Sequence, residues 1–421
     1  MTDRAAPDAS TTVPATTAGA LAGVRVIDLT TVLMGPFTTQ MLGDMGADVV
    51  KVESLQGDPV RRVGPARHPG MGAIFLQGNR SKRSLVLDLK QTEGRNAVLR
   101  LAEGADVLVY NIRPQAMARL GLTYEEVSAA NPRIVYAGMF GYDQRGPYAA
   151  RPAYDDLIQS LVALPTLAVM AGGDRPRYVP LAIADRYVAA IGVGTILGAL
   201  LHRAKSGRGQ RVDIPMFETM AQMVLGDHMG GRTFEPPLGP PGYKRSLSPE
   251  RVPYRTRDGY ISVLAYNDKQ WRSFFAAIGR PELPDADPRF ADVGSRTVHI
   301  DALYALIAEV FSARTTAEWL AILDSADIPA MPLHTLDTLI DDPHLAAIGF
   351  LQTAEHPSEG TIRSTGVPTS WSESQAAPGR PAPHLGEHSV EVLREAGYTG
   401  AEIDRLLAAG ITADGSTGAP P

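Results

Sequence analysis

The chain has 421 residues, of which 44% are hydrophobic and 20% are charged, with a formal net charge of -6 and no cysteine. These values are typical of a globular protein with two or three domains, and the negative charge argues against a nucleic-acid binder, which normally carries a basic stripe. The lack of cysteine excludes disulfides, thiolate metal ligands and a cysteine nucleophile, and it suits the reducing cytoplasm, where we expect the protein to act.

Both ends of the chain differ in composition from the rest. Residues 1–20 are rich in Ala, Thr and Pro and lack the apolar core of a signal peptide, so we expect a disordered segment there and a second one at 412–421. The longest apolar run, residues 187–201, contains three glycines and is shorter than the roughly 20 residues that cross a bilayer. We therefore expect a buried core helix that ends at His202, and no membrane partner.

From residue 21 the chain alternates short strand patterns with amphipathic helix patterns. Pro36 opens the first helix and Gly46 ends it. Strands separated by helices are typical of βαβ units, so we predict an α/β fold whose large domain, over 21–225, has a parallel sheet. The expected strands are 24–30, 48–53, 84–89, 106–111, 133–141 and one within 205–218, and the expected helices are 35–47, 92–105 and 123–132.

The pattern changes after the apolar helix. Residues 226–253 are rich in Gly and Pro and predict a long crossing loop. Residues 254–327 predict a smaller α+β domain, and residues 328–411 predict a linker that returns to the large domain and closes with two helices. In the small domain we expect a hairpin-like strand over 254–265 and helices at 269–279, 297–312 and 315–326.

A parallel sheet raises the question of a dinucleotide cofactor, and the sequence argues against one. The first predicted strand is followed by TVLMGP, which contains a single glycine, and no G-x-G-x-x-G follows any predicted strand. Gly192 and Gly194 lie inside the apolar helix, where glycine allows close helix packing. The histidines show no HExxH or paired spacing, so we expect neither a nicotinamide cofactor nor a metal site.

Asp185 lies near the start of the apolar helix, in PLAIADRYVAAIGVG, and two roles suit it. Aspartate is a favoured N-cap because its carboxylate accepts hydrogen bonds from the first free backbone N–H groups of a helix. A carboxylate that stays ionised among such N–H groups also suits attack on a thioester, because those groups stabilise the oxyanion that forms. The two roles are compatible, and this stretch alone does not choose between them.

Several longer strings are spread in order over residues 21–411: LAGVRVIDLTTVLMGPFTTQMLGDMGADVVKVE, NRSKRSLVLDLKQTEGR, RPAYDDLIQS, LAIADRYVAAIGVG and LGEHSVEVLREAGY. With them the chain resembles the class III CoA-transferases, the family of formyl-CoA and carnitine-type CoA-transferases that also contains α-methylacyl-CoA racemase. The resemblance implies a Rossmann-like large domain built from both chain ends, a small central domain, and a homodimer of two interlocked chains. It also implies acyl-CoA thioesters and carboxylic acids as substrates, with no tightly bound cofactor.

In that family the aspartate at the position of Asp185 is the nucleophile. The implied reaction starts when its carboxylate attacks the acyl carbon of a CoA thioester and forms an anhydride. The CoA thiolate then returns to give an aspartyl-CoA thioester, from which a second carboxylic acid takes the CoA. A cysteine-free chain can carry out this chemistry because the sulfur belongs to the substrate.

The resemblance also carries over residues that meet the charged parts of CoA. Lys82 and Arg83 match positions at the CoA phosphates, the natural partners of such cations, and without the family they fit a solvated basic turn equally well. Asn111 and Arg119 match positions that line the adenosine half of CoA. Without the family, Asn111 fits a strand-end cap and Arg119 fits a helix-surface charge.

Two further positions fall in the loop that approaches the CoA chain in this family, Val32 and Leu33. The formyl-CoA transferase has glutamine where this chain has Leu33, and it has arginine where this chain has Ser54. The contacts to CoA are therefore expected to differ in detail from those of the formyl transferase.

The family contains both transferases and racemases, and the segment RPAYDDLIQS separates them. The racemase uses a histidine at the position of Tyr154, and tyrosine, with an ordinary pKa near 10, is a poor general base at neutral pH. The transferases have Tyr followed by Asp or Glu, as Tyr154 and Asp155 do here, and these residues are expected to hold the substrate acid or to tune the charge of Asp185. We therefore predict a CoA-transferase, with a racemase and a non-catalytic CoA-binding protein as alternatives.

The formyl transferase also has a run of glycines over its active site. The matching segment, GPPGYKRSLSPERVPYRT, contains Gly239 and Gly242 but no such run, which makes formate and oxalate poor candidates as substrates. Its basic residues either hold an acidic acceptor or face solvent. We expect a dicarboxylate or a larger organic acid as the acceptor.

Overall fold

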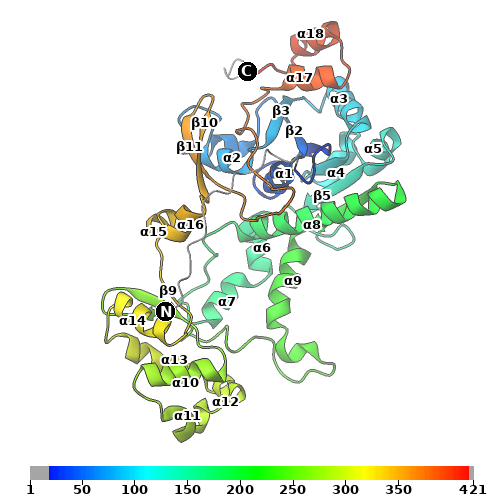
Figure 1. The fold of residues 1–421 in the computed structure, drawn as a ribbon. Helices are drawn as coiled ribbons and strands as arrows, with labels where there is room; N and C mark the ends of the chain where they lie inside the picture. The colour runs from blue at the N-terminus through cyan, green and yellow to red at the C-terminus, as the bar shows by residue number, and fades with distance from the viewer. Residues whose placement is uncertain (1–18, 417–421) are drawn as a thin grey trace. The chain divides into compact units, whose positions relative to one another are not determined.

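A computed structural model describes residues 19–416 and divides them into two units (Figure 1). Unit 1 comprises residues 19–158, 182–220 and 344–416, and unit 2 comprises residues 159–181 and 221–343. The disordered segments expected at 1–20 and 412–421 lie mostly outside the described residues, and of them only residues 19, 20 and 412–416 are described.

Unit 1 is built on a six-stranded parallel sheet with the strand order β3-β2-β1-β4-β5-β6. The prediction of an α/β fold with a parallel sheet is confirmed. The strand order reverses between β1 and β4, and loops at such a switch point diverge to leave a crevice at the carboxyl ends of the strands. The strands are β1 (Arg25–Leu29), β2 (Asp48–Glu53), β3 (Lys82–Val86), β4 (Val107–Tyr110), β5 (Val135–Phe140) and β6 (Gln210–Pro215).

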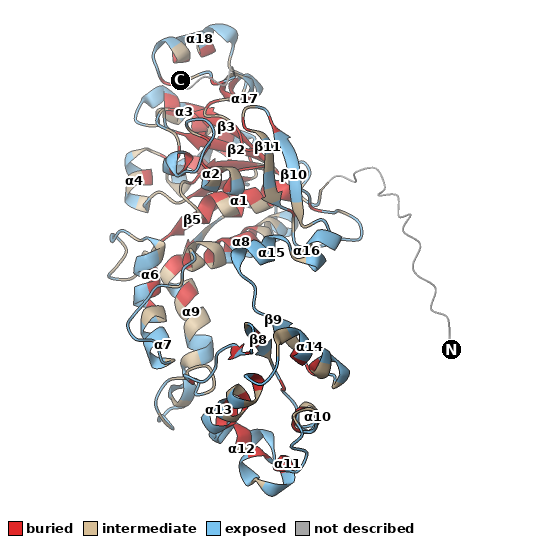
Figure 2. Cartoon of the chain, turned by 90° about the vertical axis from the view of Figure 1, so that its left-hand side faces the viewer, coloured by how far each residue is buried: buried red, intermediate tan, exposed pale blue. Residues whose placement is uncertain are grey.

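Helices from all three segments of unit 1 cover the sheet, whose strands are buried except for the edge strand β6 (Figure 2). Leu393 and Ile403, near the end of the chain, share one apolar core with Leu85 and Val98. An antiparallel hairpin over 351–365 has no counterpart in the sequence-based expectations. The elements are α1 (Met34–Asp44), α2 (Ala73–Gly78), α3 (Thr92–Glu103), α4 (Pro114–Arg119), α5 (Tyr124–Ala130), α8 (Ile183–Ser206), α17 (Ser389–Glu395), α18 (Gly400–Ala408), β10 (Leu351–His356) and β11 (Gly360–Thr365).

The apolar helix, α8, differs from its prediction in length and burial. It runs to Ser206, past the expected end at His202, and by length and composition it is able to cross a membrane. One face packs against α1 and β5, where Thr38 donates a hydrogen bond to the Ala189 carbonyl at 3.2 Å and an added Cβ at Gly192 would lie 2.8 Å from Met139. The opposite face is exposed: Leu201 is 58% accessible. The expectation of a fully buried helix is therefore wrong for this face.

Unit 2 has its own core, rich in aromatic side chains. The ring centroids of Trp271 and Phe274 lie 5.8 Å apart, and those of Phe274 and Phe311 lie 6.0 Å apart. Aromatic burial of this kind stabilises small domains strongly. The elements are α7 (Leu164–Met170), β7 (Tyr254–Arg255), β8 (Tyr260–Val263), α10 (Asp268–Ala277), α11 (Leu283–Ala286), α12 (Val293–Val298), α13 (Ile300–Phe311), α14 (Thr316–Ser325), β9 (Ala330–Pro332) and α15 (Leu336–Ile340).

Three helices cross the boundary between the units in sequence: α6 (Asp155–Leu161), α9 (Met216–His228) and α16 (Pro343–Ala347). The segment 226–253, expected to be a long loop, begins with the end of α9 and a 3-10 turn, Gly230–Thr233, and contains no further helix or strand.

Candidate active site

A pocket of about 460 Å³ lies at the carboxyl ends of β1, β4 and β5, within unit 1. This is the position at which open parallel sheets bind their ligands, because the strand order reverses between β1 and β4. Its volume falls in the range of small-molecule sites. The lining residues are 31–34, 111, 113, 139–141, 151–155, 185 and 216.

The loop after β1 forms one wall of the pocket and is held in a strained conformation. Val32 has a φ of 72°, which costs a β-branched residue about 1–3 kcal/mol. Asn111 fixes the neighbouring peptide from both sides: it accepts from the Thr31 N–H at 3.0 Å and donates to the Thr31 carbonyl at 2.7 Å. The Val32 N–H donates to Asp58 at 3.2 Å. These bonds keep the loop in one conformation before any ligand binds.

The same loop brings the N-terminus of α1 to the pocket. Leu33 is the N-cap residue of α1 and provides no side-chain cap, and both Leu33 and Met34 line the pocket. The N–H groups of a first helical turn have no partner within the helix. They form a positive helix end that suits a negatively charged ligand atom.

Asp185 enters the pocket from the first turn of α8 and does not cap that helix. The N-cap residue is Ala182, with no side-chain cap, so the interpretation of Asp185 as an N-cap is wrong. Instead, Asp155, at the start of α6, accepts a hydrogen bond from the backbone N–H of Asp185 at 2.9 Å. Because another carboxylate satisfies this N–H group, the side chain of Asp185 is left to face the pocket.

The charge state of Asp185 depends on this arrangement. Burial and the negative charge of Asp155 raise the pKa of Asp185 to about 7, against a smaller lowering effect of Arg186. The expectation that the carboxylate stays ionised therefore holds only above about pH 7. A strongly raised pKa in a cleft is typical of catalytic carboxylates.

The structure brings six of the predicted site residues together. They line the pocket from four segments that are far apart in the sequence. Tyr154 is the most exposed of them, at 67% accessibility. The six residues are Val32, Leu33, Asn111, Tyr154, Asp155 and Asp185.

Lys82 and Arg83 lie elsewhere, because β3 begins at Lys82, two residues before the predicted strand. Both side chains are buried in the sheet rather than in a solvated turn. The Lys82 ammonium group is 3.0 Å from Asp28, and it donates to the Pro36 carbonyl at 2.8 Å. Each of these cations already has a carboxylate partner within the chain.

Arg83 is paired through both guanidinium nitrogens. It lies 2.6 Å from Asp48, 2.8 Å from Glu391 and 2.9 Å from Glu395. Arg119 is exposed at the end of α4 and does not line the pocket. The three cations expected at CoA therefore lie outside the pocket around Asp185.

Two arginines that line the pocket, Arg113 and Arg151, were missed from the sequence. Neither has a carboxylate partner among residues 19–416; Arg113 donates to the Ala150 carbonyl at 3.5 Å, and Arg151 lies 4.5 Å from the Tyr148 ring centre. Their local sequence gives one weak signal, since Arg113 follows the carboxyl end of a strand. They supply positive charge next to a carboxylate nucleophile.

No metal centre is apparent in the part of the chain that the structure describes: no group of three His, Cys, Asp or Glu side chains there is arranged to hold an ion.

Comparisons with known proteins give a consistent result. A family model described as CoA-transferase family III matches residues 21–389. The succinate–glutarate CoA-transferase of Agrobacterium fabrum is 33% identical over 387 residues, which are 89% of this chain and 95% of that protein. The succinyl-CoA:mesaconate CoA-transferase of Haloarcula hispanica is 34% identical over 395 residues, 90% of this chain and 97% of that protein.

A solved structure agrees with these sequence matches. The crystal structure of a CAIB/BAIF family protein from Brucella suis superposes with a TM-score of 0.75 at 31% sequence identity. The match covers 90% of this chain and 100% of the other. Similarity in fold and in sequence thus extends over nearly the whole length of both chains.

Proposed function

The chain belongs to CoA-transferase family III and moves CoA from an acyl-CoA thioester to a free carboxylic acid, and we propose that Asp185 carries the CoA between the two as an aspartyl thioester, which forms through a mixed anhydride. One observation carries the proposal: the side chain of Asp185 lines a pocket at the switch point of the sheet, while its backbone N–H donates to Asp155. The carboxylate is thereby accessible to a substrate, and its raised pKa makes the ionised form a stronger nucleophile.

The proposed reaction has two symmetrical halves. The ionised Asp185 carboxylate attacks the thioester carbon, the C–S bond breaks, and CoA leaves as a thiolate, so that a mixed anhydride of Asp185 and the donor acid remains. The thiolate then attacks the Asp185 carbonyl carbon, which releases the donor acid as a carboxylate and leaves CoA bound to Asp185 as a thioester. The acceptor carboxylate then attacks the carbonyl carbon of this thioester, which expels the CoA thiolate and forms a second mixed anhydride. The thiolate attacks the acceptor's carbonyl carbon in that anhydride, which gives the new CoA thioester and regenerates the Asp185 carboxylate.

Each attack places a negative charge on a carbonyl oxygen, and the pocket has groups suited to it. The first turn of α1 lacks a side-chain cap and lines the pocket through Leu33 and Met34. N–H groups held in position before the reaction stabilise such an oxyanion without reorganising. The hydrogen bonds of Asn111 and Asp58 to the strained loop keep this helix start in place.

We propose a dicarboxylic acid as the physiological acceptor. Arg113 and Arg151 line the pocket, and neither has a carboxylate partner within residues 19–416. Guanidinium groups pair well with carboxylates, so one carboxylate of a dicarboxylate would meet an arginine while the other reacts at Asp185. The relatives named as succinate–glutarate and succinyl-CoA:mesaconate CoA-transferases support this substrate class.

The pH dependence of the reaction tests the role of Asp185. Because its pKa is raised to about 7 and only the ionised carboxylate is a nucleophile, kcat/KM is expected to rise with pH through about 7 and then level off. Asp155→Asn removes a negative charge that raises this pKa, while the amide oxygen still accepts from the Asp185 N–H. The rising limb of the kcat/KM profile should then move down by roughly one pH unit.

A matched control is Asp156→Asn, which removes the neighbouring carboxylate outside the pocket lining and should leave the midpoint of the limb unchanged. An Asp155→Asn profile that coincides with that of the unaltered enzyme would mean that the titrating group is not Asp185.

We also propose that the enzyme is a homodimer of two interlocked chains. The exposed face of α8 carries Ile191 and Leu201, at 40% and 58% accessibility, together with small residues at Gly194 and Gly198. An apolar face on a long helix supports a contact with a second chain. Light scattering of the active enzyme should give twice the mass of one chain, and an active species with the mass of a single chain would contradict the proposal.

A further inference from the structure

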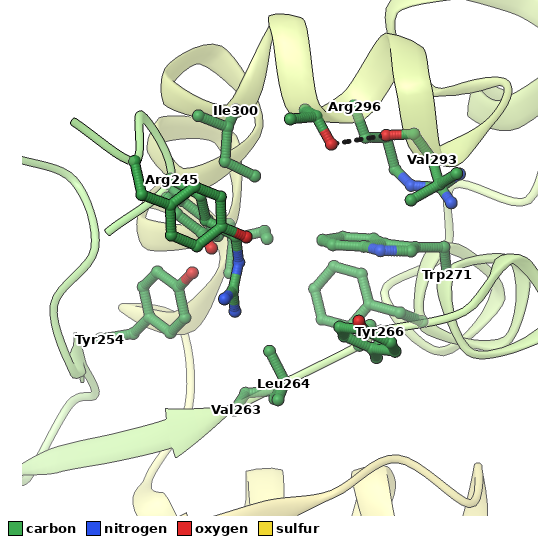
Figure 3. A pocket seen from close by; sticks show the side chains of 15 residues that line it. Arg245, Tyr254, Val263, Leu264, Tyr266, Trp271, Val293, Arg296 and Ile300 are labelled. Atoms are coloured by element: carbon green, nitrogen blue, oxygen red, sulfur yellow. Dashed lines mark hydrogen bonds between the residues drawn. The ribbon is translucent and has the colours of Figure 1, made fainter. Parts of the chain in front are cut away.

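A second cavity, of about 120 Å³, lies within unit 2 between β8, α10, α12 and α13 (Figure 3). Its floor is aromatic and buried: Trp271 is 6% accessible and Phe274 is 1% accessible. Its rim is formed by exposed side chains, among them Tyr266 and Val293. None of its lining residues belongs to the pocket around Asp185.

Arg245 extends its guanidinium group into this cavity, beside Tyr254 and across from Trp271 (Figure 3). Burial lowers the pKa of Arg245, and the neighbouring phenols of Tyr304 and Tyr243 raise it above its ordinary value. No carboxylate forms an ion pair with Arg245 anywhere in the described chain. A half-buried cation whose neighbours are neutral phenols rather than carboxylates retains most of its capacity to bind an anion.

The other arginine of the cavity, Arg296, is different. It is buried, it is paired with Asp268, and it donates to the Phe290 carbonyl at 3.0 Å. The buried Arg296 thus has a carboxylate partner, Asp268, whereas Arg245 in the same cavity has none among the described residues.

The remaining lining residues add hydrogen-bond donors but no acid. They include no Asp, Glu, Asn or Gln. Thr297 is already engaged, because its hydroxyl donates to the Val293 carbonyl at 2.7 Å. Burial raises the pKa of Tyr254 well above its ordinary value, so that phenol stays a neutral donor. A ligand with acceptor oxygens and a negative charge therefore matches the polar part of the cavity, and an apolar body matches the aromatic part.

We propose that this cavity binds a short organic acid, with its carboxylate on the Arg245 guanidinium and its apolar body between Tyr254 and Trp271. The fork of a guanidinium group matches the two oxygens of a carboxylate. The volume limits the ligand: a cavity of about 150 Å³ takes up benzene, so about 120 Å³ admits a single ring or a short chain and excludes a CoA thioester. The inference does not depend on the catalytic role of Asp185.

The tryptophans of the chain provide a direct readout. The sequence contains three, Trp271, Trp319 and Trp371, and of these only Trp271 lines the cavity. Full-length protein labelled with 5-fluorotryptophan should give a separate ¹⁹F NMR signal for each, assigned through Trp271→Phe. Benzoate is expected to shift the Trp271 signal in a saturable way and to leave the other two signals in place. Neutral benzamide, which has the same shape, should bind at least about tenfold more weakly.

The matched variants separate the role of Arg245 from a general charge effect. Arg245→Met should weaken benzoate binding about 10- to 100-fold. Arg257→Met removes an exposed arginine of the same unit that is paired with Glu318 and does not line the cavity, and it should leave the affinity unchanged. Arg245→Lys keeps the charge without the fork and should bind with intermediate affinity.

Two results would overturn the proposal. One is an equal response of Trp271 to benzamide and benzoate, which is measured on the unaltered protein and so does not depend on how any variant folds. The other is an unchanged benzoate titration in Arg245→Met or Arg245→Lys.

Discussion

Asp185→Asn is expected to lower the rate of CoA transfer at least about a thousandfold, because an amide cannot form the anhydride on which both halves of the proposed reaction depend. The asparagine has nearly the same shape as the aspartate, so the pocket should remain intact. The rate is measured with succinyl-CoA as donor and glutarate as acceptor, by mass spectrometry of the new CoA ester. Asp156→Asn, outside the pocket lining, serves as the active control.

The same substitution should not weaken the fold, which separates lost chemistry from lost structure. The pKa of Asp185 is about 7 in the folded chain and near 3.8 when it is free of its surroundings. Between these values the folded state binds more protons than the unfolded state, so this group makes the protein less stable as pH rises from about 4 to about 7. At pH 8 the asparagine variant should therefore unfold at the same or a higher denaturant concentration than the unaltered protein.

A chemical trap identifies the intermediate itself. With an acyl-CoA and no acceptor, hydroxylamine should convert Asp185 into a hydroxamate that peptide mass spectrometry detects, and Asp185→Asn should show none. If the peptide containing Asp185 stays unmodified in an enzyme sample that forms product once the acceptor is added, the covalent mechanism is wrong. A panel of acids in the transfer assay tests the acceptor class, since a strong preference for monocarboxylic acids would contradict the proposed dicarboxylate.

The second large effect is on stability and concerns the buried ion pair of Asp28 and Lys82. The two side chains are fully buried and lie 3.0 Å apart. Burial by itself raises the pKa of Asp28, but Lys82, Lys51 and two threonine hydroxyls lower it to about 2. Asp28→Asn leaves the Lys82 ammonium group without a charged partner inside the sheet. The free energy of unfolding at pH 7 is expected to fall by about 3–5 kcal/mol.

The pH dependence of stability follows from the same pair. Because the folded-state pKa of Asp28 lies below its ordinary value of 3.8, its contribution is fully present above about pH 4 and is lost as pH falls toward 2. Denaturant unfolding of the unaltered protein and of Asp28→Asn should therefore differ most near neutral pH and converge in acid.

A double-mutant cycle with Lys82→Met separates the pair from its surroundings. The double variant should be less destabilised than the sum of the single variants by about 1–3 kcal/mol, because it removes both charges together. Asp213→Asn, which breaks an exposed pair with Arg211 at 2.7 Å, should cost no more than about 1 kcal/mol. If Lys82→Met keeps full stability and only raises KM for the CoA thioester, Lys82 binds CoA and the buried pair does not support the fold.

Much of the fold was predictable because its strands and helices follow from hydrophobic patterns of neighbouring residues. Runs such as 48–53 and 106–111 have the apolar character and spacing of buried strands, and the helices between them imposed parallel pairing. The strand at Lys82 began two residues earlier than predicted, because its first residues are charged and their acidic partners, Asp28 and Glu391, lie far away in the sequence. No local pattern reports a cation that is neutralised over such a distance.

The candidate site was predictable in part for the same reason. The resemblance placed Asp185, Tyr154 and Asp155 together, and all three line the pocket. The hydrogen bond from the Asp185 N–H to Asp155, and with it the raised pKa, depends on two helix starts that are thirty residues apart in the sequence. Arg113 and Arg151 were missed because an arginine becomes a candidate for substrate binding only when the fold places it at a pocket without an ion pair.

The sequence by itself determined that this is a cysteine-free α/β protein with a parallel sheet, without a dinucleotide fingerprint, and with a carboxylate at the head of a long apolar helix. Hydrophobic periodicity, composition and short motifs are properties of neighbouring residues, so the amino-acid sequence alone is enough to identify them. Only the tertiary structure decided which charges are buried in pairs, which arginines lack an acid, and that Asp155 rather than Asp185 satisfies the start of α8. Those outcomes depend on distances between segments that are remote in the chain, and electrostatic energies change steeply with such distances.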